Sequence, residues 1–271
     1  MRLPILFSLL ASSMAVPLER RDEKDSREQN IVAVANPPVH YSVILFPAFD
    51  ALDVIGPVEV LGHLARSFQI TVSFITTASS ASSLNNSSRN ASLTPVSTRT
   101  RAASMNPFNS SAFVSIPPTH SLTDPPAQID ALIVPGGAGT RAPDLTPTIS
   151  FVASTFARLQ YLLTVCTGAG IAARAGVLDG RRATTNKKSW NETTALRPQG
   201  PLWERSARWT EDGNVWTSGG VAAGIDMMLG FVARTYGGAV ARSIALDMEY
   251  EWRDDGSWDA FAYAQDMADA E

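Results

Sequence analysis

Continuous apolar runs alternate with amphipathic stretches through the middle of the chain. Four runs of aliphatic and β-branched residues predict buried parallel strands; they are 41–46 (YSVILF), 70–75 (ITVSFI), 130–137 (DALIVPGG) and 161–165 (YLLTV). Amphipathic stretches predict helices at 53–66, 147–158, 168–175, 221–236 and 238–250. Strands that alternate with helices predict an α/β fold, in which helices cover both faces of a mostly parallel sheet.

The rest of the chain is more polar. Asp212-Gly213 is typical of a hairpin turn within 208–218, and a turn with a short strand is expected at 179–185. The proline-rich stretch 79–128 is expected to be mostly irregular. We divide the chain into a signal peptide (1–15), a polar leader (16–38), a domain (39–252) with a Ser/Asn-rich insertion (79–111), and an acidic tail (253–271).

The first fifteen residues have the order of a secretory signal. Arg2 is followed by an apolar stretch and then by small residues, with Ser13 and Ala15 at the −3 and −1 positions of a cleavage site. An amphipathic start to the fold is the alternative. Arg20-Arg21, in the leader, is either a dibasic processing site or part of a solvated tail. We therefore expect a secreted, extracellular protein whose signal peptide is removed.

Acceptor motifs for N-glycosylation agree with secretion. The pattern N-x-[ST] occurs at Asn85, Asn86, Asn90, Asn109 and Asn191. The first four fall in or beside one Ser-, Asn- and Thr-rich stretch. Such a stretch is typical of a glycosylated spacer.

Composition excludes several classes of function. The 271 residues are 45% hydrophobic with a net charge of −4, which suits one large domain. No long block of Lys and Arg is present, so we expect no nucleic-acid partner. No apolar run is long enough for a membrane span. Neither a metal-ligand spacing nor a nucleotide-binding motif occurs, so we expect no metal and no cofactor.

Cys166 is the only cysteine, so the chain has no internal disulfide. A predicted strand runs directly into it, and a predicted helix follows at Gly168. Such a junction resembles the nucleophile elbow of hydrolases. A helix N-terminus lowers the pKa of a thiol below the ordinary value of about 8.5, so a reactive thiol is one interpretation. An inert buried cysteine and an intermolecular bridge are the others.

Two further segments are directed to the same edge of the sheet. Asp53 and the pair Gly136-Gly137 each follow a predicted strand, and ligands of such sheets bind beyond the carboxyl ends of the strands. Asp53 is either a functional group at this edge or a helix N-cap. The glycines either bring backbone N–H groups close to a ligand or form a plain turn.

Four segments together resemble the DJ-1/PfpI superfamily, and within it the isocyanide (isonitrile) hydratase branch. They are ILFPAFDALDVIGPVEVL, IDALIVPGGAGTR, VCTGAGIAARAGVLDGRRATTN and SGGVAAGIDMMLGFVA, in the family's order. The resemblance implies a flavodoxin-like sandwich and a homodimer. It also implies a nucleophilic cysteine at Cys166, an acidic residue hydrogen-bonded to it at Asp53, and the threonine that follows the cysteine at Thr167.

One position departs from many relatives. Their segment reads ATTH, whereas this chain reads ATTN, with Asn186 in place of the histidine. His40, His63 and His120 all precede the cysteine. We therefore expect a Cys–acid pair rather than a Cys–His–acid triad.

The resemblance implies an enzyme that hydrates an isocyanide to an N-formamide, a small-molecule substrate. Cys166 would attack the carbon, and Asp53 would supply a proton and later accept one from water. Thr167 and the backbone at Gly136-Gly137 would hold the substrate. A redox or stress protein without a turnover substrate is the alternative. A ligand-sensing domain of a transcription regulator is disfavoured, because only about twenty residues, which end in an acidic stretch, follow the domain where a helix-turn-helix module is needed.

Overall fold

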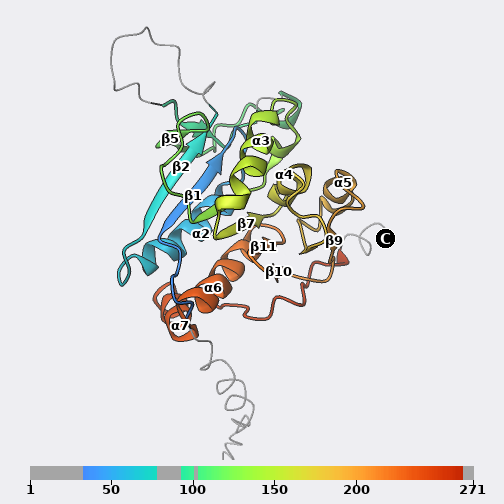
Figure 1. Ribbon diagram of the computed structural model, residues 1–271. Helices are drawn as coiled ribbons and strands as arrows, with labels where there is room; N and C mark the ends of the chain where they lie inside the picture. The colour runs from blue at the N-terminus through green and yellow to red at the C-terminus, as the bar shows by residue number, and fades with distance from the viewer. Residues whose placement is uncertain (1–32, 78–92, 101–102, 265–271) are drawn as a thin grey trace, which may run out of the picture.

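The computed structural model describes residues 33–77, 93–100 and 103–264, which form a sheet flanked by helices (Figure 1). The seven-stranded sheet has the order β10-β11-β7-β6-β1-β2-β5. Its strands are β1 (His40–Leu45), β2 (Thr71–Thr76), β5 (His120–Ser121), β6 (Ala131–Val134), β7 (Tyr161–Val165), β10 (Trp209–Asp212) and β11 (Val215–Ser218). Neighbours are parallel except β10 and β11, which form the predicted hairpin. The predicted α/β fold is confirmed.

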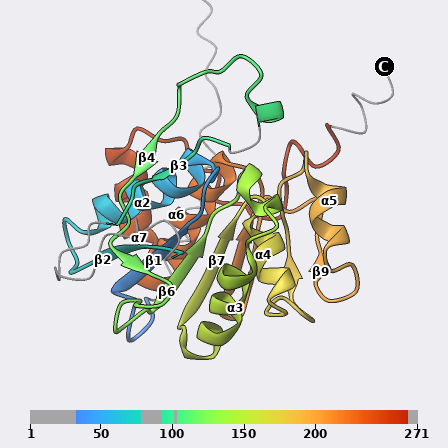
Figure 2. The same ribbon diagram turned by 90° about the horizontal axis from the view of Figure 1, so that it is seen from above.

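Helices cover both faces of the sheet (Figure 2). On one face lie α2 (Ala51–Leu64), α6 (Ala222–Tyr236) and α7 (Gly238–Asp247), and on the other α3 (Thr146–Thr155) and α4 (Gly168–Arg174). The smaller elements are α5 (Trp190–Ala195), the 3₁₀ helices η3 (Ala103–Met105), η4 (Ala138–Arg141) and η5 (Phe156–Arg158), and two small sheets, β3 (Val96–Ser97) with β4 (Ser115–Ile116) and β8 (Arg182–Ala183) with β9 (Leu202–Trp203).

Two glycines let α6 pack closely against its neighbours. A Cβ atom on Gly224 would lie 2.7 Å from Cγ1 of Val165, the last residue of β7. A Cβ atom on Gly56 of α2 would lie 2.7 Å from Cγ1 of Ile225. Both distances are shorter than real Cβ contacts. The start of α6 is therefore held close to the end of β7 and to the first half of α2, where the candidate site lies.

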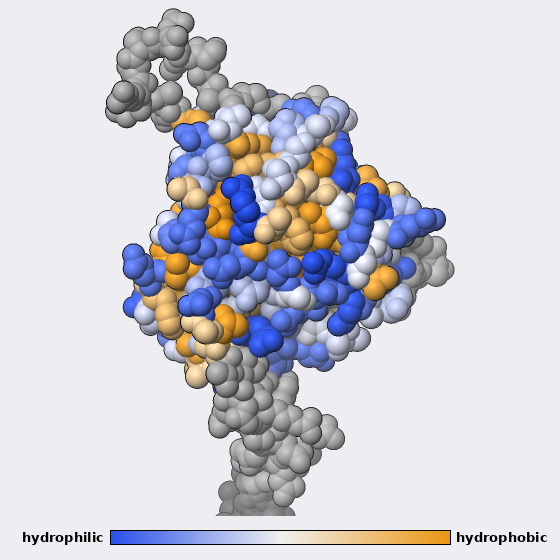
Figure 3. Space-filling model, viewed as in Figure 1, coloured by the Kyte–Doolittle hydropathy of each residue, from blue (hydrophilic) through white to orange (hydrophobic). Residues whose placement is uncertain are grey.

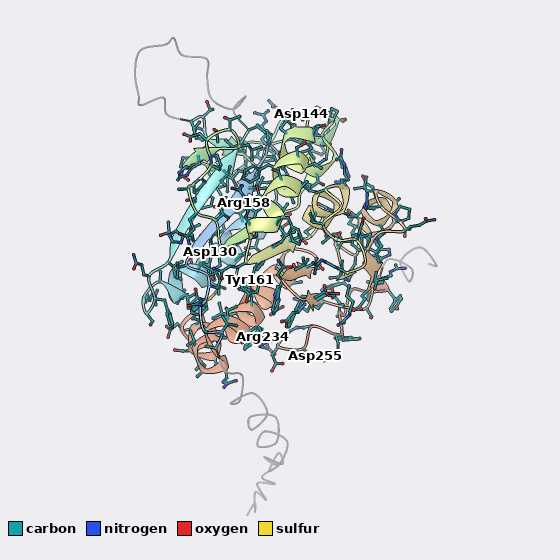
Figure 4. All side chains as sticks on the ribbon, in the orientation of Figure 1. Asp130, Asp144, Arg158, Tyr161, Arg234 and Asp255 are labelled. Carbon is teal, nitrogen blue, oxygen red and sulfur yellow. The ribbon has the colours of Figure 1, made fainter. Side chains whose placement is uncertain are left out.

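The carboxyl ends of β1, β6 and β7 meet at one edge of the sheet. In Figure 4, Asp130 and Tyr161 mark the opposite edge, where β6 and β7 begin, and Asp144 lies towards the carboxyl edge. Figure 3 shows apolar side chains gathered near the middle of the face that carries α3 and α4, with polar ones around them. Among the described residues, no helix is long and apolar enough to cross a membrane.

The structure differs from the sequence prediction at three places. Helix α2 begins at Ala51 rather than at 53, because Asp50 is the N-cap and accepts a hydrogen bond from the N–H of Leu52 at 3.3 Å. The stretch expected to be irregular contains the short strands β3, β4 and β5.

The third difference concerns residues 253–264, part of the predicted acidic tail. Gly256 accepts a hydrogen bond from Arg208 N–H at 2.8 Å, and Asp259 N–H donates to the carbonyl of Ser206 at 2.7 Å. Asp259 is 3% exposed. This part of the chain is therefore packed onto the domain. The predicted signal peptide at 1–15 and most of the leader lie outside the described residues.

Candidate active site

Cys166 lies at the bend between β7 and α4. Its backbone has a φ of +58°, a left-handed conformation that is unfavourable for a residue with a side chain. Two hydrogen bonds hold it there, from Cys166 N–H to the carbonyls of Ser218 at 3.2 Å and Gly219 at 3.0 Å. The predicted elbow is therefore present, and the side chain stands at the carboxyl edge of the sheet, 5% exposed.

Asn186 donates a hydrogen bond to the sulfur. Its Nδ2 lies 3.2 Å from Cys166 Sγ. Its Oδ1 accepts from the N–H of Ser189 at 2.9 Å, which fixes the orientation of the amide with Nδ2 towards the sulfur. The residue that replaces the histidine of many relatives is thus a direct neighbour of the thiol, and it cannot act as a base.

Asp53 is a buried acid beside the thiol. It is 0% exposed, and its Oδ2 accepts a hydrogen bond from Gly136 N–H at 2.8 Å. Its Oδ1 has no well-aligned hydrogen-bond partner among the described residues. Burial raises the pKa of Asp53 from 3.8 to about 7, helped by Asp50 and opposed by Gly136, the Cys166 thiol and the N–H of Val221.

The thiol pKa moves opposite to the sequence expectation. Burial, and then the charge of Asp53, raise the pKa of Cys166 from 9.0 to about 12, against the lowering influence of the Thr167 N–H and Asn186. The expected lowering by the helix N-terminus is therefore outweighed. The thiol favours ionisation of Asp53, whereas the Asp53 carboxylate disfavours ionisation of Cys166, so between about pH 7 and about pH 12 the coupled pair holds a single proton.

Gly136, Gly137 and Thr167 form the floor of the site. A Cβ atom on Gly136 would lie 2.8 Å from Cys166 Cβ and 2.6 Å from the backbone nitrogen of Thr167, so only glycine fits. Gly136 N–H is bound by Asp53, and Gly137 N–H donates to Thr167 Oγ1 at 3.0 Å. These groups therefore tie the site together, and their contact with a substrate stays a prediction.

Two cavities lie near this floor. The smaller, of about 370 Å³, is bordered by Thr167, Arg141 and Glu192. The larger, of about 490 Å³, is bordered by Phe46, Met105 and Arg141, among others. Neither is lined by Cys166 or Asp53. Arg141 borders both and pairs with Glu192 through Nε–Oε1 at 2.5 Å. The smaller cavity is bordered by Thr167, the residue that follows Cys166 in the chain.

The histidines lie elsewhere. His40 contacts Asp130 at 3.2 Å, His63 lies 3.5 Å from Glu59, and His120 contacts Thr119 at 2.9 Å. Among the described residues, no group of three or more His, Cys, Asp or Glu side chains is arranged to hold a metal ion. Asn186 and Asp53 are the side chains that interact with the thiol, and catalysis by a Cys–acid pair stays a prediction.

The predicted glycosylation sites are only partly visible. Asn109 and Asn191 are exposed, the first in a loop and the second in α5. Asn85, Asn86 and Asn90 lie outside the described residues.

Comparison with known families agrees with the geometry of the elbow. The model of the DJ-1/PfpI family matches residues 41–234. The chain belongs to the DJ-1/PfpI family. Among the curated relatives of this DJ-1/PfpI protein, an isonitrile hydratase from Pseudomonas putida is 31% identical over 210 residues, covering 76% of each chain. The HTH-type transcriptional regulator GbdR from Pseudomonas aeruginosa is 32% identical over 130 residues, which are 48% of this chain and 35% of the regulator.

Solved structures show the same fold. A ThiJ/PfpI family protein from Pseudomonas syringae superposes with a TM-score of 0.60 at 25% identity, covering 89% of this chain and 84% of that one. A DJ-1 superfamily protein from Salmonella typhimurium gives 0.58 at 23% identity, covering 79% of this chain and all of the other. The latter comparison shows the fold alone. The predicted membership of the superfamily is confirmed.

Sequence reasoning missed two groups around this DJ-1/PfpI site. The ATTN segment singles out Asn186 as a departure from many relatives, but the sequence does not show the hydrogen bond from Asn186 to the sulfur. Val221, whose N–H acts on Asp53, has a φ of +39° just before α6. Nothing in the sequence around Val221 indicates that conformation. A valine held there is strained, as is typical of residues at functional sites.

Proposed function

We propose that this DJ-1/PfpI protein hydrates isocyanides to N-formamides. The observation that carries the proposal is the pair of Asp53 and Cys166, a fully buried carboxyl with a near-neutral pKa beside a thiol on a strained bend. An acid with such a pKa can give and take a proton at neutral pH. The likeness to an isonitrile hydratase over three quarters of both chains supports this choice of substrate.

The first step adds the thiol to the terminal carbon of the isocyanide. The S–H bond of Cys166 breaks as its proton passes to the Asp53 carboxylate, and a C–S bond forms. Asp53 then gives that proton to the same carbon, which forms the C–H bond of a thioimidate. No group leaves, so the adduct has the mass of protein plus isocyanide.

The second step is attack of water on the thioimidate carbon. Asp53, again a carboxylate, accepts one proton of the water and passes it to the nitrogen as the C=N bond becomes single, which leaves a hydroxyl group on the carbon. The C–S bond then breaks as the carbonyl of the formamide forms, and the hydroxyl proton passes through Asp53 to the sulfur. The two hydrogens of water end on the nitrogen and on Cys166, so atoms and charges balance.

The other neighbours of the sulfur fit this sequence. Asn186 Nδ2 and the N–H of Thr167 donate towards the sulfur and so favour its thiolate form while the proton is in transit. Both act on the leaving sulfur in the second step as well. Each such donor contributes a modest share, since a hydrogen bond to a charged group is worth about 1.5–3 kcal/mol.

Incubation with alkyl and aryl isocyanides tests the proposal. Formamide production is followed by NMR, with Cys166→Ala as the control variant. Turnover by the wild type and none above the uncatalysed rate by Cys166→Ala is expected. Formamide at the uncatalysed rate only, across isocyanides of different size, would remove the proposal.

A redox role is the second candidate, and the raised thiol pKa weighs against it. Oxidation by peroxide proceeds through the thiolate, and burial beside Asp53 keeps that form scarce at neutral pH. Rapid conversion of Cys166 to a sulfinate at neutral pH, without any isocyanide turnover, would replace the hydratase proposal with this one.

We also propose that the protein is secreted as an N-glycosylated homodimer. The signal-like start and the sequons support secretion, the exposure of Asn109 and Asn191 suits glycan attachment, and the family resemblance supports the dimer. Expression in a secreting eukaryotic host, with intact mass before and after glycosidase and light scattering for oligomeric state, tests all three. A protein that retains Met1 would contradict secretion with removal of the signal peptide. A mass unchanged by glycosidase would contradict glycosylation, and a monomer in light scattering would contradict the homodimer.

A further inference from the structure

Four charged side chains are buried together outside the candidate site. Lys187, Arg208, Asp226 and Asp259 are each 6% exposed or less. Nζ of Lys187 lies 3.8 Å from Asp259, and Nη1 of Arg208 lies 3.6 Å from the same carboxylate. Arg208 also binds Asp226 through Nε at 2.7 Å and Nη2 at 2.6 Å. Two cations and two anions thus neutralise each other, as burial of charge requires.

Asp259 reaches this cluster from the C-terminal segment, residues 253–264. Its own backbone is fixed by the hydrogen bond to Ser206, and its Oδ1 accepts from the N–H of Phe261 at 3.0 Å. The segment therefore delivers one carboxylate to a defined position beside Lys187.

The ammonium of Lys187 is bound to the two residues between β8 and Asn186 and to Ala207. Nζ donates to Thr184 Oγ1 at 2.6 Å, to the carbonyl of Ala207 at 2.6 Å and to the carbonyl of Thr185 at 3.3 Å. An ammonium has three N–H donors, so these contacts use all of them. Burial lowers the pKa of Lys187 to about 8, and the charge of Asp259 opposes this by favouring the protonated form.

The two residues directly before Lys187 contact Cys166, and Lys187 binds the carbonyl of the first of them, Thr185. Thr185 Oγ1 donates to the carbonyl of Cys166 at 2.9 Å, and Asn186 Nδ2 donates to its sulfur. Because Lys187 directly follows Asn186, anchoring its ammonium restricts where the amide of Asn186 lies. We propose that Lys187 and Asp259 are positioning residues, which act on the sulfur of Cys166 through Asn186.

The expected effect on Cys166 follows from loss of the hydrogen bond that the Asn186 amide donates to its sulfur. Asn186 lowers the thiol pKa, so a displaced amide raises it and reduces the fraction of thiolate. A rise of about one pKa unit means about tenfold less thiolate, and therefore about tenfold slower alkylation. A role confined to stability would leave the alkylation rate of the folded protein unchanged.

Alkylation of the full chain by iodoacetamide, followed by intact mass at mildly alkaline pH, tests the proposal. Lys187→Met and Asp259→Asn should each slow modification of Cys166 about tenfold. Lys188→Met is the matched control, because Lys188 is the exposed neighbouring lysine, and it should react like the wild type. An unchanged or faster rate in folded Lys187→Met or Asp259→Asn would overturn the proposal. If Lys187→Met does not fold, Asp259→Asn carries the test.

A double-mutant cycle tests the route through Asn186. Asn186→Ala alone should slow alkylation about as much as Lys187→Met, and the combination should be no slower than either, because both remove one interaction. If alkylation of the double variant were slowed by the product of the two single effects, the route through Asn186 would be overturned. The assay uses no isocyanide, so failure of the proposed hydratase activity would leave this inference standing, and the reverse also holds.

Discussion

Asp53→Asn should stabilise the protein as the pH rises, because it removes a carboxylate that the fold holds in an unfavourable place. The folded pKa of Asp53 is about 7 against 3.8 for the ordinary group. Folding raises the pKa of Asp53. The protonated carboxyl therefore contributes its full stabilisation below the pKa of the unfolded state, and this contribution is lost as the pH rises through the pKa of the folded state. The total is roughly 4 kcal/mol, of which about 3 kcal/mol is lost between about pH 5 and pH 8.5.

Urea unfolding of wild type and Asp53→Asn across this range gives the measurement. The free energy of unfolding of Asp53→Asn, minus that of the wild type, should increase by about 3 kcal/mol from about pH 5 to about pH 8.5. Asparagine keeps an oxygen for Gly136 N–H, so the pH-dependent part reports the charge alone. Helix α2 keeps its cap, since Asp50 rather than Asp53 caps it.

Asp130→Asn is the control of opposite sign. Burial raises the pKa of Asp130, but hydrogen bonds from Gln128, Val39 and His40 outweigh it and lower the pKa below 3.8. The stability that Asp130 contributes is therefore present above the unfolded pKa and is lost as the pH falls through the folded value. A difference between wild type and Asp53→Asn that stays flat with pH would refute the reasoning that Asp53 is an acid with a near-neutral pKa.

Two further predictions address the same site. Asp53→Asn should speed alkylation of Cys166 by iodoacetamide, because loss of the carboxylate charge lowers the thiol pKa, even while formamide production falls; a slower alkylation would show that Asp53 activates the thiol instead. Gly136→Ala should cost about 2–4 kcal/mol of stability and most of the activity, because its Cβ would collide with Cys166 and Thr167. Gly62→Ala, with nothing within 4 Å of its Cβ, should keep both, as thermal unfolding and the formamide assay would show; equal losses in the two variants would contradict the collision.

The sequence predicted what local patterns determine. Unbroken apolar runs located the four central strands, and the order of strand, Cys166 and glycine located the elbow. The direction of Asp53 towards the same edge followed from the parallel sheet. These features depend on neighbours in the chain, or on a rule that all parallel sheets obey.

The sequence predictions that differ from the structure concern features that depend on tertiary packing. The helix N-terminus beside Cys166 is visible in the sequence, but the burial and the Asp53 charge that outweigh it are not. Asp50 rather than Asp53 caps α2, because the helix begins two residues before the apolar pattern indicates. The acidic composition of 253–264 is typical of an exposed tail, so it does not indicate that the carboxylate of Asp259 is buried beside Lys187.

The pH profile of kcat/KM for formamide production tests the central claim most directly, because it reports the proton that Cys166 and Asp53 share. For the wild type, kcat/KM should rise about tenfold per pH unit below about pH 7 and then level off. Asp53→Asn should lack this rise and retain less than about a hundredth of the activity. A wild-type profile that is flat through this range, or one that Asp53→Asn reproduces, would contradict the account.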